Sequence, residues 1–124
     1  MHEAATSQAI ARFVLDESAR QKAEKVLSIE IEIGRLSVLN PEQVEFWVKL
    51  CLEKTTASDA EVRIAVIEPE VSCKVCGYTG PLELEDDPMF HYYTPSFACP
   101  ECGSGGIIVN KGRGCVIKRI EMRA

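Results

Sequence analysis

Residues 26–33 read VLSIEIEI, and their pattern decides the fold. Apolar and polar side chains alternate along this stretch, which is the period of a strand with one buried face and one face in water. The apolar face comprises Leu27, Ile29, Ile31 and Ile33, and the polar face comprises Ser28, Glu30 and Glu32. Gly34 ends the strand. The sequence therefore predicts a sheet that is covered on only one side.

Helices are expected before and after this strand. Residues 3–24 contain few helix breakers, and one face carries side chains at helical spacing: Ile10, Phe13, Val14 and Glu17. A second helix begins with Asn40 as N-cap, Pro41 at the first helical position and Gln43 as capping-box partner. Its apolar stripe is Val44, Trp47, Val48 and Cys51. Both helices can cover the apolar face of the strand.

Two further strands are predicted, at residues 61–67 (EVRIAVI) and 115–122 (CVIKRIEM). The crossover through the second helix favours a parallel arrangement of the first two strands. We therefore expect an α/β protein of the α+β type, with two helices on a three-stranded mixed sheet. From Val71 the composition changes to Cys, Gly, Pro and Tyr without a sustained period. This change predicts a zinc-ribbon module at 71–111, inserted into an α/β domain formed by 1–70 and 112–124.

The composition excludes several classes of function. The chain has 124 residues and a net charge of −5, and its charges are spread along the sequence, which disfavours nucleic acid as a partner. No apolar stretch approaches the roughly 20 residues that span a bilayer, and the N-terminus lacks the pattern of a secretory signal. A cytoplasmic location is expected. Since disulfides are rare in a reducing compartment, the six cysteines require another explanation.

Four of the cysteines form two matching CxxC pairs, each followed by glycine: Cys73 with Cys76, and Cys99 with Cys102. Such turns aim two thiolates at one point, and two pairs supply the tetrahedral sulfur set that structural zinc prefers. With four sulfur ligands there is no open position for a catalytic water. No nucleophile–base pair or phosphate loop is evident either, so we expect no catalytic residues and no enzymatic activity.

Two alternatives share the cysteine signal. A rubredoxin-like protein would hold iron in the same four sulfurs, and spacing alone does not separate the two metals. A zinc-ribbon interaction adaptor also fits. Such ribbons in transcription or translation factors usually carry basic residues, whereas this loop contains Glu83, Glu85, Asp86 and Asp87. Cys51 and Cys115 are most simply small buried hydrophobic residues.

A second metal site can form at the N-terminus. The Met1 amine, the backbone nitrogen of His2 and the His2 imidazole can close two chelate rings around one ion, and a variant uses the amide nitrogen of Glu3. A planar set of nitrogens suits Ni(II) or Cu(II). By themselves these residues are more typical of a solvated helix start. His91 is the only other histidine and can supply a fourth ligand, although a loop histidine packed among aromatics is the simpler interpretation.

Taken together, these motifs resemble the hydrogenase nickel-incorporation proteins of the HypA/HybF family. The resemblance spans essentially the whole chain, and its residues are Met1-His2-Glu3, the run 31–37, Pro41-Glu42, Glu45-Phe46, the paired cysteines, Gly112-Arg113-Gly114 and the strand from Ile117 to Met122. It implies a metallochaperone that carries Ni(II) at His2, with Met1 and Glu3 contributing and His91 completing the site as in the archaeal form.

The same resemblance implies structural Zn(II) at Cys73, Cys76, Cys99 and Cys102. The expected partners are a nickel-insertion GTPase or ATPase of the HypB type and the precursor of the NiFe-hydrogenase large subunit. In some organisms the family also serves urease.

Overall fold

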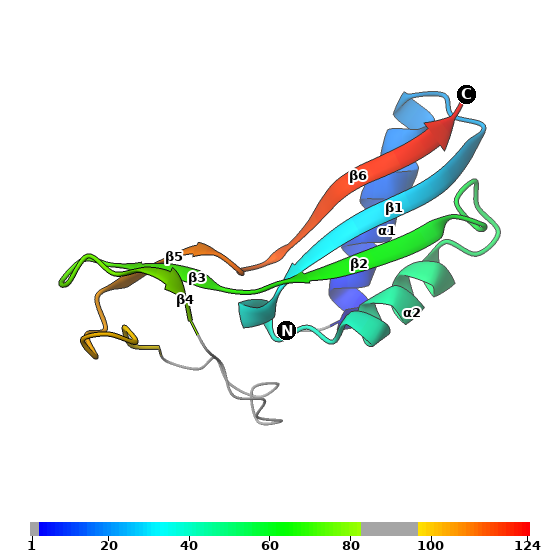
Figure 1. The fold of residues 1–124 in the computed structure, drawn as a ribbon. Coiled ribbons are helices and arrows are strands. Elements are labelled where there is room, and N and C mark those ends of the chain that lie inside the picture. Colours follow the sequence, from blue (N-terminus) through cyan, green and yellow to red (C-terminus); the bar gives the residue numbers. More distant parts are fainter. Residues whose placement is uncertain (1–2, 83–96) are drawn as a thin grey trace.

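The structure is a computed structural model, and it describes residues 3–82 and 97–124. Two helices, one 3₁₀ turn and six strands follow one another in these residues (Figure 1). Their bounds are α1 Glu3–Arg20, β1 Lys25–Gly34, η1 Arg35–Ser37, α2 Pro41–Cys51, β2 Glu61–Ile67, β3 Glu70–Cys73, β4 Thr79–Pro81, β5 Ile107–Lys111 and β6 Cys115–Arg123. Within the described part of the chain, no helix is long and apolar enough to cross a membrane.

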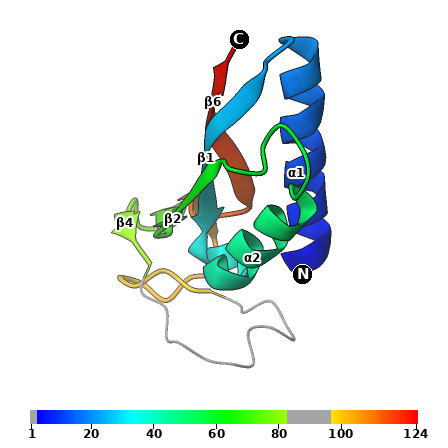
Figure 2. The same cartoon turned by 90° about the vertical axis from the view of Figure 1, so that its right-hand side faces the viewer.

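The larger sheet has the strand order β2-β1-β6, with the strand at residues 25–34 in the centre. β1 is parallel to β2 and antiparallel to β6, so the predicted mixed sheet of three strands is confirmed. Both helices lie on the same face of this sheet (Figure 2). The opposite face is wet and is crossed by ion pairs such as Arg63 with Glu30 at 3.2 Å.

The hydrophobic core lies between the helices and the sheet. Each element contributes residues that are less than a tenth exposed: Ile10, Ala11 and Val14 from α1, Val44 and Val48 from α2, and Val26, Ile29, Ile31 and Ile33 from β1. Burial of such branched apolar side chains stabilises the fold by about 1.5–3 kcal/mol each. The apolar residues that alternate along 29–33 thus form the core face of the central strand.

The first helix differs from the prediction in two respects. It ends at Arg20 rather than near residue 24, because Lys22 adopts a left-handed φ of 53° and the Ala23 N–H donates to the Ser18 carbonyl at 2.9 Å. This is the hydrogen-bond pattern of a Schellman motif, which stops a helix. Phe13, expected on the apolar stripe, is 51% exposed because it lines an open groove beside the edge strand β6.

The predicted face of β1 is wrong at its first position. Leu27 is 40% exposed, whereas Val26 is fully buried. The register with β6 shifts between Val26 and Ser28, so Leu27 is the extra residue of a β-bulge. Because a bulge reverses which side chains face the core, the buried face continues from Ile29 to Val26. Ser28 is buried as a result.

The second helix begins as predicted, with one change of partner. Asn40 is the N-cap, and its side-chain oxygen accepts hydrogen bonds from the backbone N–H groups of Glu42 and Gln43 at 2.9 and 3.2 Å. The N–H of Asn40 was expected to meet the side chain of Gln43. It donates instead to the Glu3 carboxylate at 3.0 Å, because tertiary packing brings the start of α1 beside this cap.

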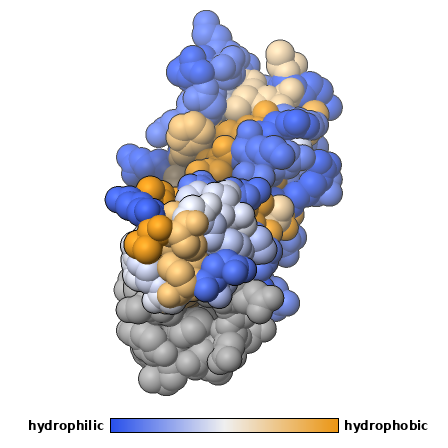
Figure 3. Space-filling model, turned by 60° about the vertical axis from the view of Figure 1, so that its left-hand side comes forward, coloured by the Kyte–Doolittle hydropathy of each residue, from blue (hydrophilic) through white to orange (hydrophobic). Residues whose placement is uncertain are grey.

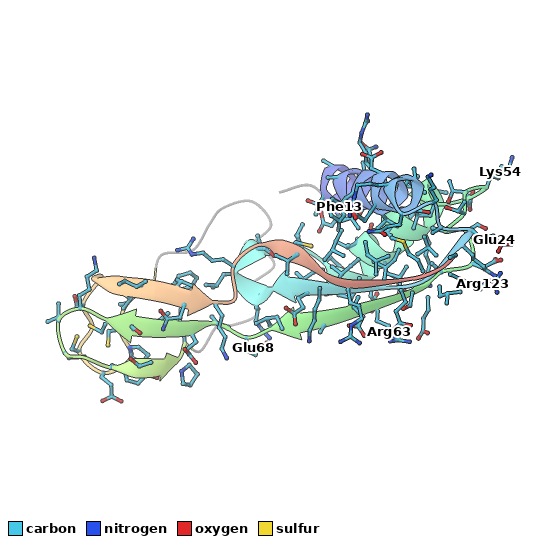
Figure 4. All side chains as sticks on the ribbon, turned by 90° about the horizontal axis from the view of Figure 1, so that it is seen from above. Phe13, Glu24, Lys54, Arg63, Glu68 and Arg123 are labelled. Atoms are coloured by element: carbon cyan, nitrogen blue, oxygen red, sulfur yellow. The ribbon has the colours of Figure 1, made fainter. Side chains whose placement is uncertain are left out.

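A second sheet, of order β4-β3-β5, extends away from the helices (Figures 1 and 4). The sequence pattern did not predict these two short antiparallel pairings. The two sheets meet where β1 ends. There the Gly34 N–H donates to the Gly114 carbonyl at 2.7 Å, and the Leu36 N–H donates to the Gly112 carbonyl at 2.9 Å.

Candidate metal centre

The second sheet brings the four paired cysteines together at one end. Cys73 is the last residue of β3 and Cys76 lies in the turn that follows, while Cys99 and Cys102 lie in the turn before β5. All four Sγ atoms lie within 4.8 Å of one another. The closest pairs join the two turns: Cys73 with Cys102 and Cys76 with Cys99, each at 3.6 Å. The sulfur atoms gather at the end of the module in Figure 4.

The two turns have the same geometry. In the first, the Cys73 N–H donates to the Tyr78 carbonyl at 2.7 Å, and the Gly77 N–H donates to the Cys73 carbonyl at 3.1 Å. The second turn repeats both bonds, from Cys99 to Ser104 at 2.8 Å and from Gly103 to Cys99 at 2.9 Å. Both glycines adopt a left-handed backbone, with φ of 80° and 76°. The CxxCG pattern therefore encodes the turn as well as the thiols.

Backbone N–H groups point at the buried sulfur of each turn. Cys73 Sγ accepts from Val75 and Cys76 at 3.4 and 3.5 Å, and Cys99 Sγ accepts from Glu101 at 3.4 Å. One thiol of each pair is buried and the other is exposed. Donors directed at sulfur stabilise thiolates, which are the form that binds metal.

The sulfur separations fit a tetrahedral metal ion. With a zinc–sulfur distance of about 2.3 Å, the edges of a sulfur tetrahedron are about 3.8 Å long. A disulfide would require about 2.05 Å between sulfurs, far less than the observed 3.6 Å. Since all four donors are soft thiols, the set suits Zn(II) or iron and leaves no position for a reacting water. We therefore describe it as a four-cysteine metal site.

Protonation of the thiols depends on the same contacts. Hydrogen bonds from the N–H groups of Cys76 and Val75 lower the pKa of Cys73 to about 6. At Cys76 the N–H of Tyr78 acts in the same direction, but desolvation by the neighbouring atoms and the adjacent thiols outweigh it and raise the pKa to about 12. The pKa of Cys102 is also raised: the Ser104 N–H lowers it, and burial with the Cys73 thiol more than offsets this. Among these three thiols, deprotonation is therefore favoured at Cys73 and disfavoured at Cys76 and Cys102.

The remaining cysteines lie elsewhere. Cys51 and Cys115 are half-buried and pack against the core of the larger sheet, close to the role expected of them. Burial raises the pKa of the Cys115 thiol. Neither belongs to the four-sulfur cluster.

The proposed nickel residues are only partly described. Met1, His2 and His91 lie outside the described residues. Glu3 is the first residue of α1, and its carboxylate meets the Asn40 N–H at the start of α2. Sequence reasoning missed Asn40 as a neighbour of the N-terminal motif, since nothing in a local pattern relates residues 37 positions apart.

Comparison with known proteins covers the whole chain. The profile of the family described as "Hydrogenase/urease nickel incorporation, metallochaperone, hypA" matches residues 1–122. The hydrogenase maturation factor HypA of Methanothermobacter thermautotrophicus is 36% identical over 98% of this chain and 97% of its own length. The HypA of Methanobrevibacter smithii is 38% identical over 97% of this chain and 94% of its own.

Solved structures share the fold. The solution structure of the nickel metallochaperone HypA from Helicobacter pylori superimposes with a TM-score of 0.67 at 19% identity, covering 100% of this chain and 99% of that one. A second HypA solution structure gives a TM-score of 0.69 at 20% identity, covering 98% and 96%. The architecture predicted from the sequence is thus that of these proteins, and the chain belongs to the hydrogenase/urease nickel-incorporation family, HypA.

Proposed function

We propose that this protein carries Ni(II) and delivers it during maturation of NiFe-hydrogenase. The observation that carries the proposal is the family match over residues 1–122, which includes the N-terminal Met1-His2-Glu3 as well as both cysteine pairs. Family membership also weighs against the two alternatives, a zinc-ribbon adaptor and a rubredoxin-like iron protein. Delivery requires binding and release but no turnover, so we propose a carrier rather than an enzyme.

The cargo site lies at the N-terminus in this proposal. His2 supplies its imidazole and backbone nitrogen, and either the Met1 amine or the Glu3 amide completes the chelate. The first N–H groups of a helix have no partner within the helix, so recruiting one of them breaks no hydrogen bond of α1. Planar nitrogen donors favour Ni(II) over Zn(II). We assign the fourth ligand to His91.

The four cysteines hold a structural ion, which we propose is Zn(II). Among the described residues of the module, the buried apolar side chains besides the cysteines are Val71 and Leu82. A segment with so little core depends on metal binding for its folding free energy. We therefore propose that residues 71–111 form a zinc-dependent module and that residues 1–70 with 112–124 form the nickel domain.

The delivery partners in this proposal are a nickel-insertion GTPase or ATPase of the HypB type and the large-subunit precursor of a NiFe-hydrogenase. Maturation of such an enzyme places the carrier in the cytoplasm. Nucleic acid has no role in it, in keeping with the net charge of −5.

A nickel titration tests the proposal. Wild type, His2→Ala and His91→Ala are titrated with Ni(II) by calorimetry, while bound zinc is counted by elemental analysis. We expect one nickel per wild-type chain, loss of that nickel in His2→Ala and unchanged zinc. Equal uptake by His2→Ala would refute the N-terminal site. A red protein with bound iron would instead support the rubredoxin-like alternative.

A further inference from the structure

Strand β6 has one free edge. It is the last strand in the order β2-β1-β6, and in the part of the chain that the structure describes no strand pairs with its outer side (Figure 1). The Arg123 carbonyl points toward the chain that enters β1, because it accepts a hydrogen bond from the Glu24 N–H at 2.8 Å. Since backbone groups alternate in direction along a strand, the N–H and carbonyl groups of Ile120 and Met122 point outward. Such unpaired groups are a template for a further strand.

An open groove runs beside this edge, between α1 and β6. Its volume is about 550 Å³, and its large apolar side chains are Phe13 from α1 with Ile117, Ile120 and Met122 from β6. Phe13 is 51% exposed, and the three side chains of β6 are only partly buried (Figure 4). Apolar surface next to an unpaired strand edge is typical of a site where another chain packs.

The charges of β6 determine which strand fits this edge. Arg119 and Glu121 flank Ile120 on the wet face of the sheet, where Arg119 lies 3.8 Å from Glu30. Glu121 is exposed, and within the described residues no ion pair includes it. If two copies of β6 pair antiparallel about Ile120, Arg119 of each copy lies opposite Glu121 of the other. These two positions form a pair without backbone hydrogen bonds, in which the Cα atoms are about 4.5 Å apart and the side chains are closest.

Neighbouring registers place like charges together. Pairing centred on Glu121 would set that carboxylate opposite its own copy and Arg119 opposite Arg123. Pairing centred on Arg119 would set two guanidinium groups opposite each other. Like charges directly opposite destabilise a strand pair. Pairing centred on Ile120 instead joins opposite charges over a long overlap, residues 117–123 of each copy.

We propose that the outer edge of β6 is a dimerisation surface and that its occupant is β6 of a second copy of this chain. The two copies are related by a two-fold axis that passes between their Ile120 residues and stands perpendicular to the sheet. Their larger sheets join into one sheet of order β2-β1-β6-β6-β1-β2. Both α1 helices stay on the same face, so the two grooves meet and each Phe13 becomes less exposed. None of the residues at this edge is a proposed metal ligand.

Charge reversal tests the pairing. Sedimentation velocity of the zinc-loaded full chain, over a wide range of concentrations, should show a monomer–dimer equilibrium. Glu121→Arg and Arg119→Glu should each raise the dimer Kd about tenfold or more, because each reversal turns two symmetric attractions into repulsions. The double variant with both substitutions restores opposite charges, and its Kd should return to within about threefold of wild type. Arg63→Glu is the matched control: Arg63 also pairs with Glu30, at 3.2 Å, but belongs to β2 at the other edge of the sheet. Its Kd should equal that of wild type.

Amide exchange locates the interface. In ¹⁵N-labelled, zinc-loaded protein, the outward Ile120 N–H should exchange with solvent more slowly as the concentration rises. The Glu121 N–H points toward β1 and should exchange at the same rate throughout. A monomer at every concentration would overturn the proposal and leave the edge to a strand of another protein. A dimer whose Kd ignores the single reversals, is not restored in the double variant, or leaves Ile120 exchange unchanged uses another surface, and each of these results overturns the proposal as well.

Discussion

The junction of the two sheets makes a strong prediction about Gly34. Its backbone, with φ of −69° and ψ of 133°, is open to any residue, so only space requires glycine there. A Cβ at this position would lie 2.6 Å from the Arg113 nitrogen and closer still to the Gly112 carbonyl. All of these are backbone atoms, which cannot rotate away. Gly34→Ala must therefore push the end of β1 away from the segment that leads into β6 (Figure 1).

The cost can be worked from the contacts that this movement disturbs. Overpacking by one methyl group costs about 1–3 kcal/mol. The two hydrogen bonds at 2.7 and 2.9 Å between this end of β1 and residues 112–114 contribute about 0.5–1.5 kcal/mol each. We expect a total loss of about 2–6 kcal/mol, which for a chain of this size lowers Tm by about 10 °C or more.

Thermal unfolding of the zinc-loaded protein, followed by circular dichroism of the helices, measures this effect. Gly114→Ala is the control: its φ of 69° is left-handed, but no atom lies within 4 Å of the added Cβ. That substitution carries only the conformational cost of about 1–2 kcal/mol. A Gly34→Ala protein whose Tm lies within about 2–3 °C of the wild-type value would refute the packing argument, because its loss of stability would be below about 1 kcal/mol. A Tm no lower than that of the control would refute it as well.

Four further outcomes are expected. Chelation of zinc should abolish the amide signals of β3, β4 and β5 while the helices keep their circular dichroism, because the module alone depends on metal. Zinc binding at pH 7 should release at least two protons, from Cys76 and Cys102 with their raised pKa values, as read by a pH indicator. Zinc affinity should fall more steeply below about pH 6, where Cys73 also takes up a proton. Asn40→Ala should cost about 1 kcal/mol in urea unfolding through loss of the cap, since its side chain accepts two backbone hydrogen bonds; an unchanged midpoint would contradict this.

Figure 3 shows apolar side chains reaching the surface on one face of the molecule. Exposed apolar side chains show the limit of predicting burial from helical periodicity. Phe13 and Phe46 are 51% and 58% exposed, although each belongs to an amphipathic helix. A helical stripe predicts which side chains share a face, but the width of the neighbouring sheet decides how many of them are covered. Phe13 lines an open groove beside the edge strand β6, so its exposure could not be predicted from the sequence.

Local patterns determined the elements that depend on neighbouring residues. The alternation at 29–33 predicted the central strand, and the pair Asn40-Pro41 predicted the start of α2. The CxxCG motifs predicted two matching turns. Each of these rests on interactions within a few residues, where spacing alone fixes geometry. The paired motifs also indicated a shared metal site, and the structure brings their sulfurs within 4.8 Å.

Only the tertiary structure decided the contacts between distant segments. The bulge at Leu27 depends on the register of β6, and the partner of the Asn40 N–H depends on where α1 begins. Gly34 must be glycine because backbone atoms of Gly112 occupy the space that a Cβ would need. In each case the two groups are separated by tens of residues along the chain. Their meeting follows from the packing of two helices and two sheets, which no local pattern contains.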